Sequence, residues 1–274
     1  MTGRGTRWAA GAGLGLLVVA SAFPFYWAIV ASLSPEAALF ERPSLWPAEI
    51  VLDHYRALFE VRDFWVPIRN SLVVAGATTL FCVVVGSFAA YAIARLRFRG
   101  KALIMGFILA VTMFPQISIV SPLYLLLRAL GLIDTYPGLI LPYLTFAMPL
   151  TVWLLVGFFR QLPADLEEAA LVDGASRWQA FVKVMLPLAV PGLATTGILT
   201  FIYCWNEFLF ALSFTLGPER QTVPVAIALF RGQYQVPWGQ ILAAAVVATA
   251  PVAALVLAFQ RRIVQGLTAG AVKG

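Results

Sequence analysis

Charge, histidine and cysteine are scarce in this chain of 274 residues. Only 12% of its residues are charged and 61% are hydrophobic, with a mean hydropathy of +0.87, whereas a soluble domain is about 45–50% apolar. The single histidine, His54, excludes a histidine-rich metal site and a Ser-His-Asp triad in the membrane. Cys82 and Cys204 fall inside apolar runs, so they provide no disulfide framework. The composition therefore predicts an integral membrane protein.

Six stretches are long enough to cross a membrane, because a spanning helix needs about 20 mainly apolar residues. They are residues 8–33, 70–94, 102–127, 139–159, 191–216 and 240–259. The apolar run of the first exceeds the roughly 7–15 residues of a signal peptide core, so we expect it to be retained. The fold class predicted is all-α, with six transmembrane helices forming a single domain over residues 1–274.

Basic residues on short connections predict how this domain is oriented. They are Arg4 and Arg7 before the first span, Arg95, Arg97, Arg99 and Lys101 after the second, and Arg261, Arg262 and Lys273 after the sixth. Since such residues are retained inside the cell, both termini, the loop 160–190 and the tail 260–274 are predicted to be cytoplasmic. The acid-rich loop 34–69 is then external. The net charge of +6 is assigned to this orientation in the plasma (inner) membrane and not to nucleic acid binding.

A nucleotide-binding P-loop is also missing. Such a loop ends in Gly-Lys followed by Ser or Thr, but the Gly100-Lys101 pair is followed by Ala102. Any ATP hydrolysis that the protein depends on must therefore take place on another chain.

The loop 160–190 is charged and is punctuated by glycine and proline. Pro163 followed by three acids predicts a helix start, and Gly174 predicts its end. Ser176 with Gln179 is a capping-box pattern that opens a second helix, which Pro187 is expected to break before the fifth span. Two interpretations stay open from these residues: an amphipathic hairpin at the membrane surface, or a rigid knob on which a soluble motor pushes.

The same loop resembles a known motif. Glu168-Ala169-Ala170, Asp173-Gly174-Ala175 and Leu186-Pro187 resemble the EAA motif of ABC importer permeases. The stretches GLILPYLTFAMPL, FIYCWNEFLFALSF and FQRRIVQGLTAGAVKG are similar to the six-span permeases of maltose-type carbohydrate importers. The resemblance covers nearly the whole chain and implies a bundle of the MetI-like type.

This resemblance implies a division of work among several chains. A second permease subunit would complete the pathway, a cytoplasmic ATPase dimer would bind ATP and Mg, and an external sugar-binding protein would deliver the substrate. The chain itself would be no enzyme and would hold no cofactor. The residues that would couple to the ATPase are Glu167, Glu168, Ala169, Ala170, Asp173, Gly174, Ala175 and Pro187. Those of the tail that would reach the ATPase are Gln265, Gly266, Gly270 and Lys273, and glycine is expected to make this tail flexible when free.

A second candidate site lies inside the membrane. Its residues are Tyr203, Trp205, Asn206 and Glu207 of the fifth span, with Gln116 of the third. A carboxyl at the centre of a span costs about 2.5–3.5 kcal/mol on insertion scales, so Glu207 either makes a structural hydrogen bond or lines a sugar pathway. Prolines in the third and fourth spans are expected to bend them around this pathway. External residues expected to meet the binding protein are Arg231, Gln233 and Tyr234.

The function predicted is that of a permease subunit of an ATP-driven sugar importer. The resemblance favours an alpha-linked glucose disaccharide such as trehalose, maltose or sucrose. The alternatives are an autonomous channel or secondary transporter, and a membrane-embedded enzyme. The enzyme would need a second cluster of acids or histidines opposite the acids of the loop 160–190, and the sequence contains none.

Overall fold

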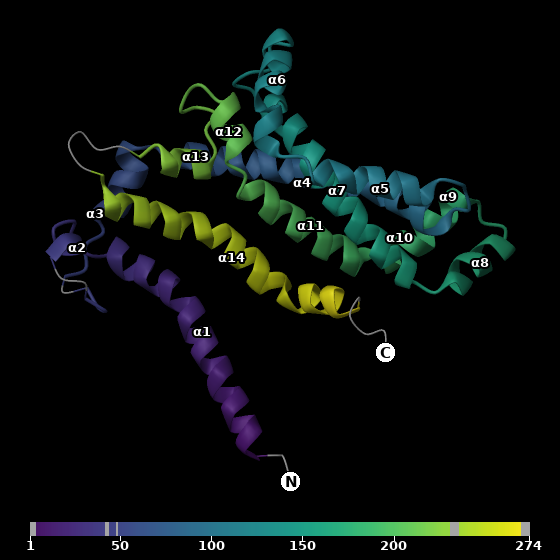
Figure 1. Ribbon diagram of the computed structural model, residues 1–274, viewed down its shortest axis with the longest axis horizontal. Coiled ribbons are helices and arrows are strands. Elements are labelled where there is room, and N and C mark those ends of the chain that lie inside the picture. The colour runs from purple at the N-terminus through teal and green to yellow at the C-terminus, as the bar shows by residue number, and fades with distance from the viewer. Residues whose placement is uncertain (1–3, 42–43, 48, 231–235, 270–274) are drawn as a thin grey trace. The chain divides into compact units, whose positions relative to one another are not determined.

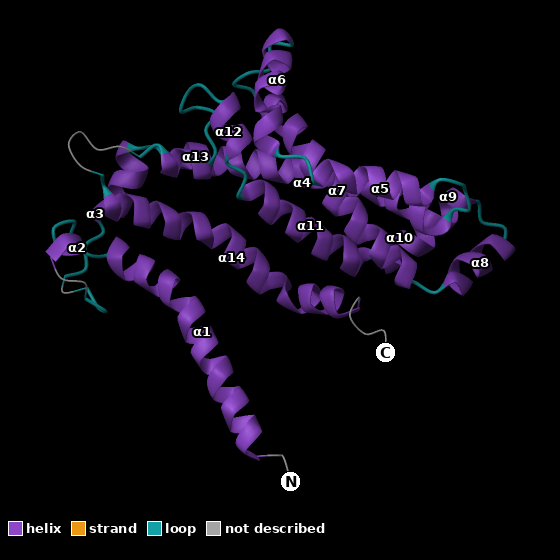
Figure 2. Cartoon of the chain, in the orientation of Figure 1, coloured by secondary structure: helices purple, strands orange, loops and turns teal. Residues whose placement is uncertain are grey.

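The structure, a computed structural model, describes residues 4–41, 44–47, 49–230 and 236–269, with the backbone alone in 4–9, 41 and 261–269. These ranges contain helices and loops and no strand (Figure 1, Figure 2). The predicted all-α class is confirmed.

Four helices of the described chain are long and apolar enough to cross a membrane. They are α1 (Arg4–Ser32), α4 (Trp65–Arg95), α7 (Tyr136–Gln161) and α14 (Trp238–Ala269). Two pairs of shorter helices pass the same test only when taken together, each as a broken span or a re-entrant loop: α5 (Lys101–Thr112) with α6 (Gln116–Ala129), and the segment Arg177–Leu188 with α11 (Val190–Trp205). If each pair counts as one span, the described residues hold the predicted six.

One of the expected prolines lies at a break between two helices, and the others lie inside continuous helices. The axes of α5 and α6 differ by 89° across a break that contains Pro115. By contrast, α7 continues through Pro142 and Pro149, and α6 through Pro122. Pro142 and Pro149 are both buried, so packing on both sides of α7 keeps the helix intact although two backbone N–H groups are missing. The fourth span is therefore one continuous helix, and the bend expected in it stays a prediction.

Contacts divide the chain into two compact units. The first consists of residues 1–65 and 227–251, and it includes α1, α2 (Ala38–Glu41), α3 (Asp53–Arg56), η1 (Ala57–Val61) and the beginning of α14. Here the Glu36 carboxylate accepts hydrogen bonds from the backbone N–H of Trp238 (2.9 Å) and Gly239 (3.0 Å). An acid at a helix N-terminus stabilises it, so Glu36 ties the loop after α1 to the start of α14.

The second unit consists of residues 66–226 and 252–274 and contains α4 to α13. Its helix α7 contacts α5 and α11 along their lengths. A buried cluster joins α4, α7 and the loop 160–190: Ala90, Tyr91, Ile93, Val152, Leu155, Val156, Phe159, Phe181, Met185 and Ala189. Burial of each large side chain contributes about 1.5–3 kcal/mol, so this cluster attaches the loop firmly to the two spans.

The last helix is longer than expected. We predicted that the sixth span ends at residue 259 and that a flexible tail follows, but α14 continues to Ala269. No proline interrupts residues 260–269, and one glycine inside a helix costs only about 1 kcal/mol. The part of the tail before residue 270 is therefore helical.

Candidate functional site

The loop 160–190 forms two short helices joined at a tight elbow. Helix α8 (Ala164–Val172) follows Pro163, and Gly174 takes the left-handed conformation with φ of +85°. Helix α9 (Arg177–Ala180) then begins at Ser176, whose side chain accepts the backbone N–H of Gln179 while Gln179 accepts that of Ser176. The predicted helix start, glycine elbow and capping box are all confirmed. In Figure 1, α8 and α9 lie together at one end of α4 and α7.

The chain then turns into the fifth span. It continues through a π-helical turn, η2 (Phe181–Met185), and the short α10 (Leu186–Leu188), and bends by 72° into α11. Pro187 and Pro191 lie at the first positions of α10 and α11. The predicted break is confirmed. Because of it, the segment Arg177–Leu188 runs at an angle to α11 and does not continue its axis.

Aromatic packing holds the second helix against α4. The Phe181 ring is buried, with its centroid 4.6 Å from that of Tyr91 and 6.2 Å from that of Phe159. Trp178 is 61% exposed but stacks on Phe88 of α4 at 5.7 Å. Since aromatic pairs add about 0.5–1.5 kcal/mol each beyond their buried area, α9 and η2 are fixed to α4 at several points.

The two neighbouring glutamates of α8 have different surroundings. Glu168 is exposed, whereas Glu167 is only 9% exposed. The Tyr91 hydroxyl donates a 2.7 Å hydrogen bond to the Glu167 carboxylate, and the Arg95 Nε lies 3.8 Å from its other oxygen. We predicted that both glutamates face the ATPase, but Glu167 points into this chain.

The outer surface of the elbow is acidic and has small side chains close to the backbone. Its exposed members are Asp165, Glu168, Ala169, Asp173, Gly174 and Pro187, with Ala170 and Ala175 half-buried. No lysine, arginine or histidine of the described chain lies within 4 Å of the Asp165, Glu168 or Asp173 carboxylates. Small side chains allow close approach of another backbone, and carboxylates without internal partners suit a basic protein surface.

A polar cavity of about 340 Å³ lies on the inner side of the elbow. Its lining consists of Ala94, Arg95, Arg97, Ala164, Glu167, Glu168, Leu171 and Arg177. Arg95 also donates a hydrogen bond to the carbonyl of Leu162, the residue that ends α7. Sequence reasoning used Arg95 and Arg97 only for orientation and missed their position beside the two glutamates. No signal in the sequence alone placed residue 95 next to residue 167.

The proposed pathway residues do not all lie together. Gln116 at the start of α6 donates a 2.8 Å hydrogen bond to the Tyr203 hydroxyl of α11, and Asn206 is exposed one turn further on. Trp205 is buried and stacks on Phe201. Polar hydroxyl-binding groups therefore gather at Gln116, Tyr203 and Asn206, whereas the Trp205 ring faces the protein interior.

Asn206 and Glu207 lie where the fifth span is interrupted. The Asn206 amide donates to the carbonyl of Ile202 (2.7 Å) at the end of α11. The Glu207 carboxylate accepts the N–H of Phe210 (2.8 Å) and Ala211 (3.1 Å) in α12 (Leu209–Phe214). We predicted one continuous span over 191–216, but these two side chains satisfy the backbone groups that the break leaves free. Glu207, 8% exposed, thus makes the structural hydrogen bonds that we held open as an alternative.

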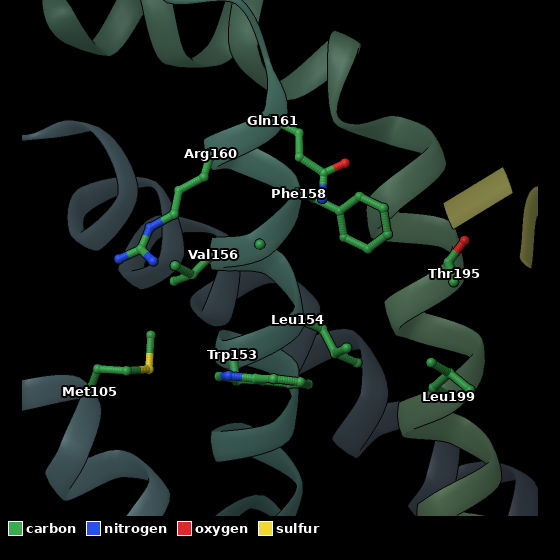
Figure 3. A pocket seen from close by; sticks show the side chains of 10 residues that line it. Met105, Trp153, Leu154, Val156, Phe158, Arg160, Gln161, Thr195 and Leu199 are labelled. Carbon is green, nitrogen blue, oxygen red and sulfur yellow. The ribbon is translucent and has the colours of Figure 1, made fainter. Parts of the chain in front are cut away.

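A largely apolar pocket of about 380 Å³ lies between α5, α7 and α11 (Figure 3). Leu154 and Phe158 of α7 point toward Thr195 and Leu199 of α11, whereas Arg160 points away from α11 (Figure 3). Hydroxyl-rich ligands need several convergent polar groups, and Trp153, Leu154 and Phe158 offer none toward this space except the indole N–H. The pocket is therefore distinct from the polar pathway candidates, and we assign it no ligand.

On the predicted external side, Asn70 of α4 connects three segments. Its Nδ2 donates to the carbonyls of Glu219 and Gln221, each at 2.9 Å, and its Oδ1 accepts from the Tyr136 hydroxyl at 2.8 Å. Sequence reasoning missed this residue. Arg231, Gln233 and Tyr234, predicted to meet a binding protein, lie outside the described residues.

The predicted tail residues are described only in part. Gln265 and Gly266 belong to the backbone of α14, while Gly270 and Lys273 lie outside the described residues. Within the described chain, no three His, Cys, Asp or Glu residues lie close enough together to hold a metal ion.

Comparison with known proteins gives the family context of this geometry. Residues 82–269 match the profile of a family described as "Binding-protein-dependent transport system inner membrane component". The chain is 50% identical to the trehalose transport system permease protein SugB of Mycobacterium tuberculosis (strain CDC 1551 / Oshkosh), with 99% of this chain and 98% of the relative covered. It is 42% identical to the trehalose/maltose transport system permease protein MalG of Thermococcus litoralis, with 94% of each chain covered.

A solved structure has the same fold. It is a chain of a bacterial ABC transporter involved in the import of the acidic polysaccharide alginate, with a TM-score of 0.81 over 95% of this chain and 98% of that chain. The sequence identity is 23%, so this likeness shows the architecture.

Proposed function

The chain belongs to the family of inner membrane components of binding-protein-dependent transport systems, and from this premise we propose that it is a permease subunit of an ATP-driven sugar importer. The substrate we propose is an alpha-linked glucose disaccharide, with trehalose first and maltose and sucrose as further candidates. The names of two relatives, a trehalose permease and a trehalose/maltose permease, support this choice.

The observation that carries the coupling part of the proposal is the acidic elbow of α8 and α9. Its exposed carboxylates Asp165, Glu168 and Asp173 have no cation within 4 Å among the described side chains, although Glu168 borders the cavity lined by arginines, while its inner side is packed on α4 and α7. A rigid body of this kind transmits a push, because packed side chains do not deform continuously. We propose that a cytoplasmic ATPase dimer receives the elbow, with Glu168 as the acid that meets a basic ATPase residue and Gly174 as the bend.

Transport then follows from displacement and needs no covalent chemistry in this chain. ATP binding would close the ATPase dimer, move the elbow, and with it the ends of α4 and α7, and so alternate the access of the pathway. The pathway would be completed by a second permease subunit and supplied by an external binding protein. Gln116, Tyr203 and Asn206 are the residues of this chain that we propose line it, since Asn206 is exposed and Gln116 and Tyr203, which bond each other, are only half-buried.

The orientation is part of the same proposal. Both termini and the elbow would be cytoplasmic, because the basic residues around α4, α5 and the end of α14 belong inside. Arg231, Gln233 and Tyr234 would then be external and could contact the binding protein. The tail around Gln265, Gly266, Gly270 and Lys273 would reach the ATPase.

Purification from native membranes tests the proposal. The chain is tagged at its N-terminus, which spares the tail, and extracted in mild detergent. We expect a second permease and a P-loop ATPase in stoichiometric amounts, and trehalose uptake driven by ATP when the complex is placed in liposomes with its binding protein. A matched complex whose ATPase lacks the P-loop lysine is the control. Recovery of this chain alone, folded and stable, would overturn the proposal and favour an autonomous channel.

A further inference from the structure

Two adjacent acids of α8 differ in burial, although the sequence presents them as a pair. Both border the polar cavity that Arg95, Arg97 and Arg177 also line, but successive residues of a helix are about 100° apart around its axis, and only one of the two side chains is covered. Glu168 is exposed on the outer side, and Glu167 is the only buried residue of α8. Only one of the two is therefore available to a partner protein.

We infer that Glu167 is a positioning residue that fixes α8 to α4, so that displacement of the elbow moves α4 with it. The joint consists of the Glu167 carboxylate, the Tyr91 hydroxyl and the Arg95 guanidinium. This inference rests on the proposed function, because it names the residue through which motion of the elbow would reach α4. It also removes Glu167 from the set of residues that contact the ATPase.

The joint combines one hydrogen bond with one ion pair, and the Arg95 Nε itself has no hydrogen-bond partner among the described residues. The Tyr91 hydroxyl donates to one Glu167 oxygen at 2.7 Å, and Arg95 Nε lies 3.8 Å from the other oxygen. The same guanidinium donates to the carbonyl of Leu162. A buried carboxylate is held in place only when such partners are present. One arginine therefore connects the end of α4 with the end of α7 and with α8.

The remainder of the elbow is attached in another way. Phe181 and Met185 are buried against Tyr91 and Phe159 by apolar contact, whereas α8 contributes no buried apolar side chain. The left-handed Gly174 separates α8 from this apolar attachment. Loss of the Glu167 joint would remove the hydrogen bond and the ion pair between α8 and α4, and would leave the attachments through α9, η2 and Leu162.

Substitution of the two glutamates should therefore reduce two different quantities: the sugar transported per ATP hydrolysed for Glu167, and the capture of the ATPase for Glu168. Glu167→Gln keeps the shape of the side chain and removes the ion pair, and the cavity of about 340 Å³ beside it leaves room for the amide. We expect the E167Q complex to retain its ATPase but to transport at least about fivefold less sugar per ATP hydrolysed. Glu168→Gln is expected to reduce ATPase capture at least about fivefold, while each complex that does form remains coupled. Glu60→Gln, at an exposed acid outside the elbow, is the control and should change neither.

A second measurement needs no partner. Hydrogen exchange of the α8 amides in the purified full chain should become at least about tenfold faster in E167Q and in Tyr91→Phe, and should stay unchanged in E60Q. Tyr91→Phe keeps the ring packing on Phe181 and removes a single hydroxyl, so it remains informative if E167Q does not fold. The double variant E167Q/Y91F should exchange faster than either single variant, because E167Q removes the ion pair to Arg95, Y91F removes the hydrogen bond, and glutamine alone can still accept the Tyr91 hydroxyl.

Two results would overturn the inference. Loss of ATPase capture by E167Q to the same extent as by E168Q would make Glu167 a partner contact, and wild-type coupling with wild-type exchange in E167Q would leave the joint without a role. If the unaltered chain captures no ATPase at all, the proposed function fails instead, and the exchange measurement still decides whether the joint exists.

Discussion

Gly192 of α11 lies directly against the ring of Phe158 of α7: a Cβ atom at residue 192 would lie 2.5 Å from the Phe158 Cγ and 3.0 Å from its Cβ. The Cβ and Cγ atoms of Phe158 lie close to its backbone and cannot move aside as the far end of a flexible side chain can. This contact therefore requires glycine at residue 192. Overpacking of a core costs about 1–3 kcal/mol. We expect Gly192→Ala to lower the thermal unfolding midpoint of the purified chain, and Gly192→Val to lower it further.

Gly76 of α4 is the matched control for this prediction. A Cβ atom there meets nothing within 4 Å, so Gly76→Ala should leave the midpoint unchanged or raise it slightly through helix propensity. Equal effects at both positions would show that the contact between α7 and α11 is not as close as the structure has it.

Gly174 should control coupling and not insertion into the membrane. Its φ of +85° is closed to proline and unfavourable for alanine. We expect Gly174→Pro to abolish sugar uptake while ATP hydrolysis by the assembled complex continues and the chain remains in the membrane. Gly131 has a φ of +68° in a turn outside the elbow, so Gly131→Ala should cost stability without uncoupling. Normal coupling in G174P would contradict the elbow mechanism.

Asn70 should hold the segment 217–222 in place. Asn70→Ala removes a buried amide and leaves the carbonyls of Glu219 and Gln221 without their donor, a loss of about 1–3 kcal/mol for each unsatisfied group. We expect trypsin to cleave after Arg220 several-fold faster in intact vesicles of the variant. Tyr136→Phe removes one hydrogen bond to the same amide and should produce a smaller acceleration. Unchanged cleavage in N70A would show that other contacts hold the segment.

Glu207 should act as a helix cap and not as a sugar ligand. Glutamine offers one acceptor oxygen where the carboxylate offers two, so Glu207→Gln should lose one of the bonds to Phe210 and Ala211 and about 1 kcal/mol of stability. The KM for trehalose in the assembled importer should stay unchanged. Tyr203→Phe, at a residue on the accessible surface, should raise that KM. A raised KM in E207Q with unchanged stability would return Glu207 to the pathway.

The orientation can be checked with single cysteines. Asp173 and Glu219 are both exposed, and the native Cys82 and Cys204 are buried. A membrane-impermeant thiol reagent added to intact cells should label Glu219→Cys and not Asp173→Cys, while inside-out vesicles should give the reverse. Labelling of both from one side would overturn the proposed topology.

Local features of this fold were readable from the sequence because they depend on neighbouring residues. The capping box of Ser176 and Gln179 and the glycine elbow at Gly174 each involve residues only a few positions apart, and they were predicted correctly. The six apolar segments depend on composition alone. All of these are short-range properties of the chain.

Features that depend on distant residues were missed or misjudged. The Glu167 joint spans 76 positions to Tyr91, and no periodicity within α8 shows that one of two adjacent acids turns inward. The same holds for Asn70, whose partners lie 149 and 151 positions away. The continuity of α7 through Pro142 and Pro149 is likewise a result of burial between helices, which outweighs the local preference of proline.

The interruption at Asn206 and Glu207 has a consequence for the lipid environment. Free N–H and C=O groups cost several kcal/mol each in hydrocarbon because no water is there to bond them, yet the fifth span breaks with an amide on one end and a carboxylate on the other. The Glu207 carboxylate accepts the N–H groups of Phe210 and Ala211, so these two groups need no water at the start of α12. The break therefore exposes fewer unbonded backbone groups to lipid than a simple interruption of the helix would.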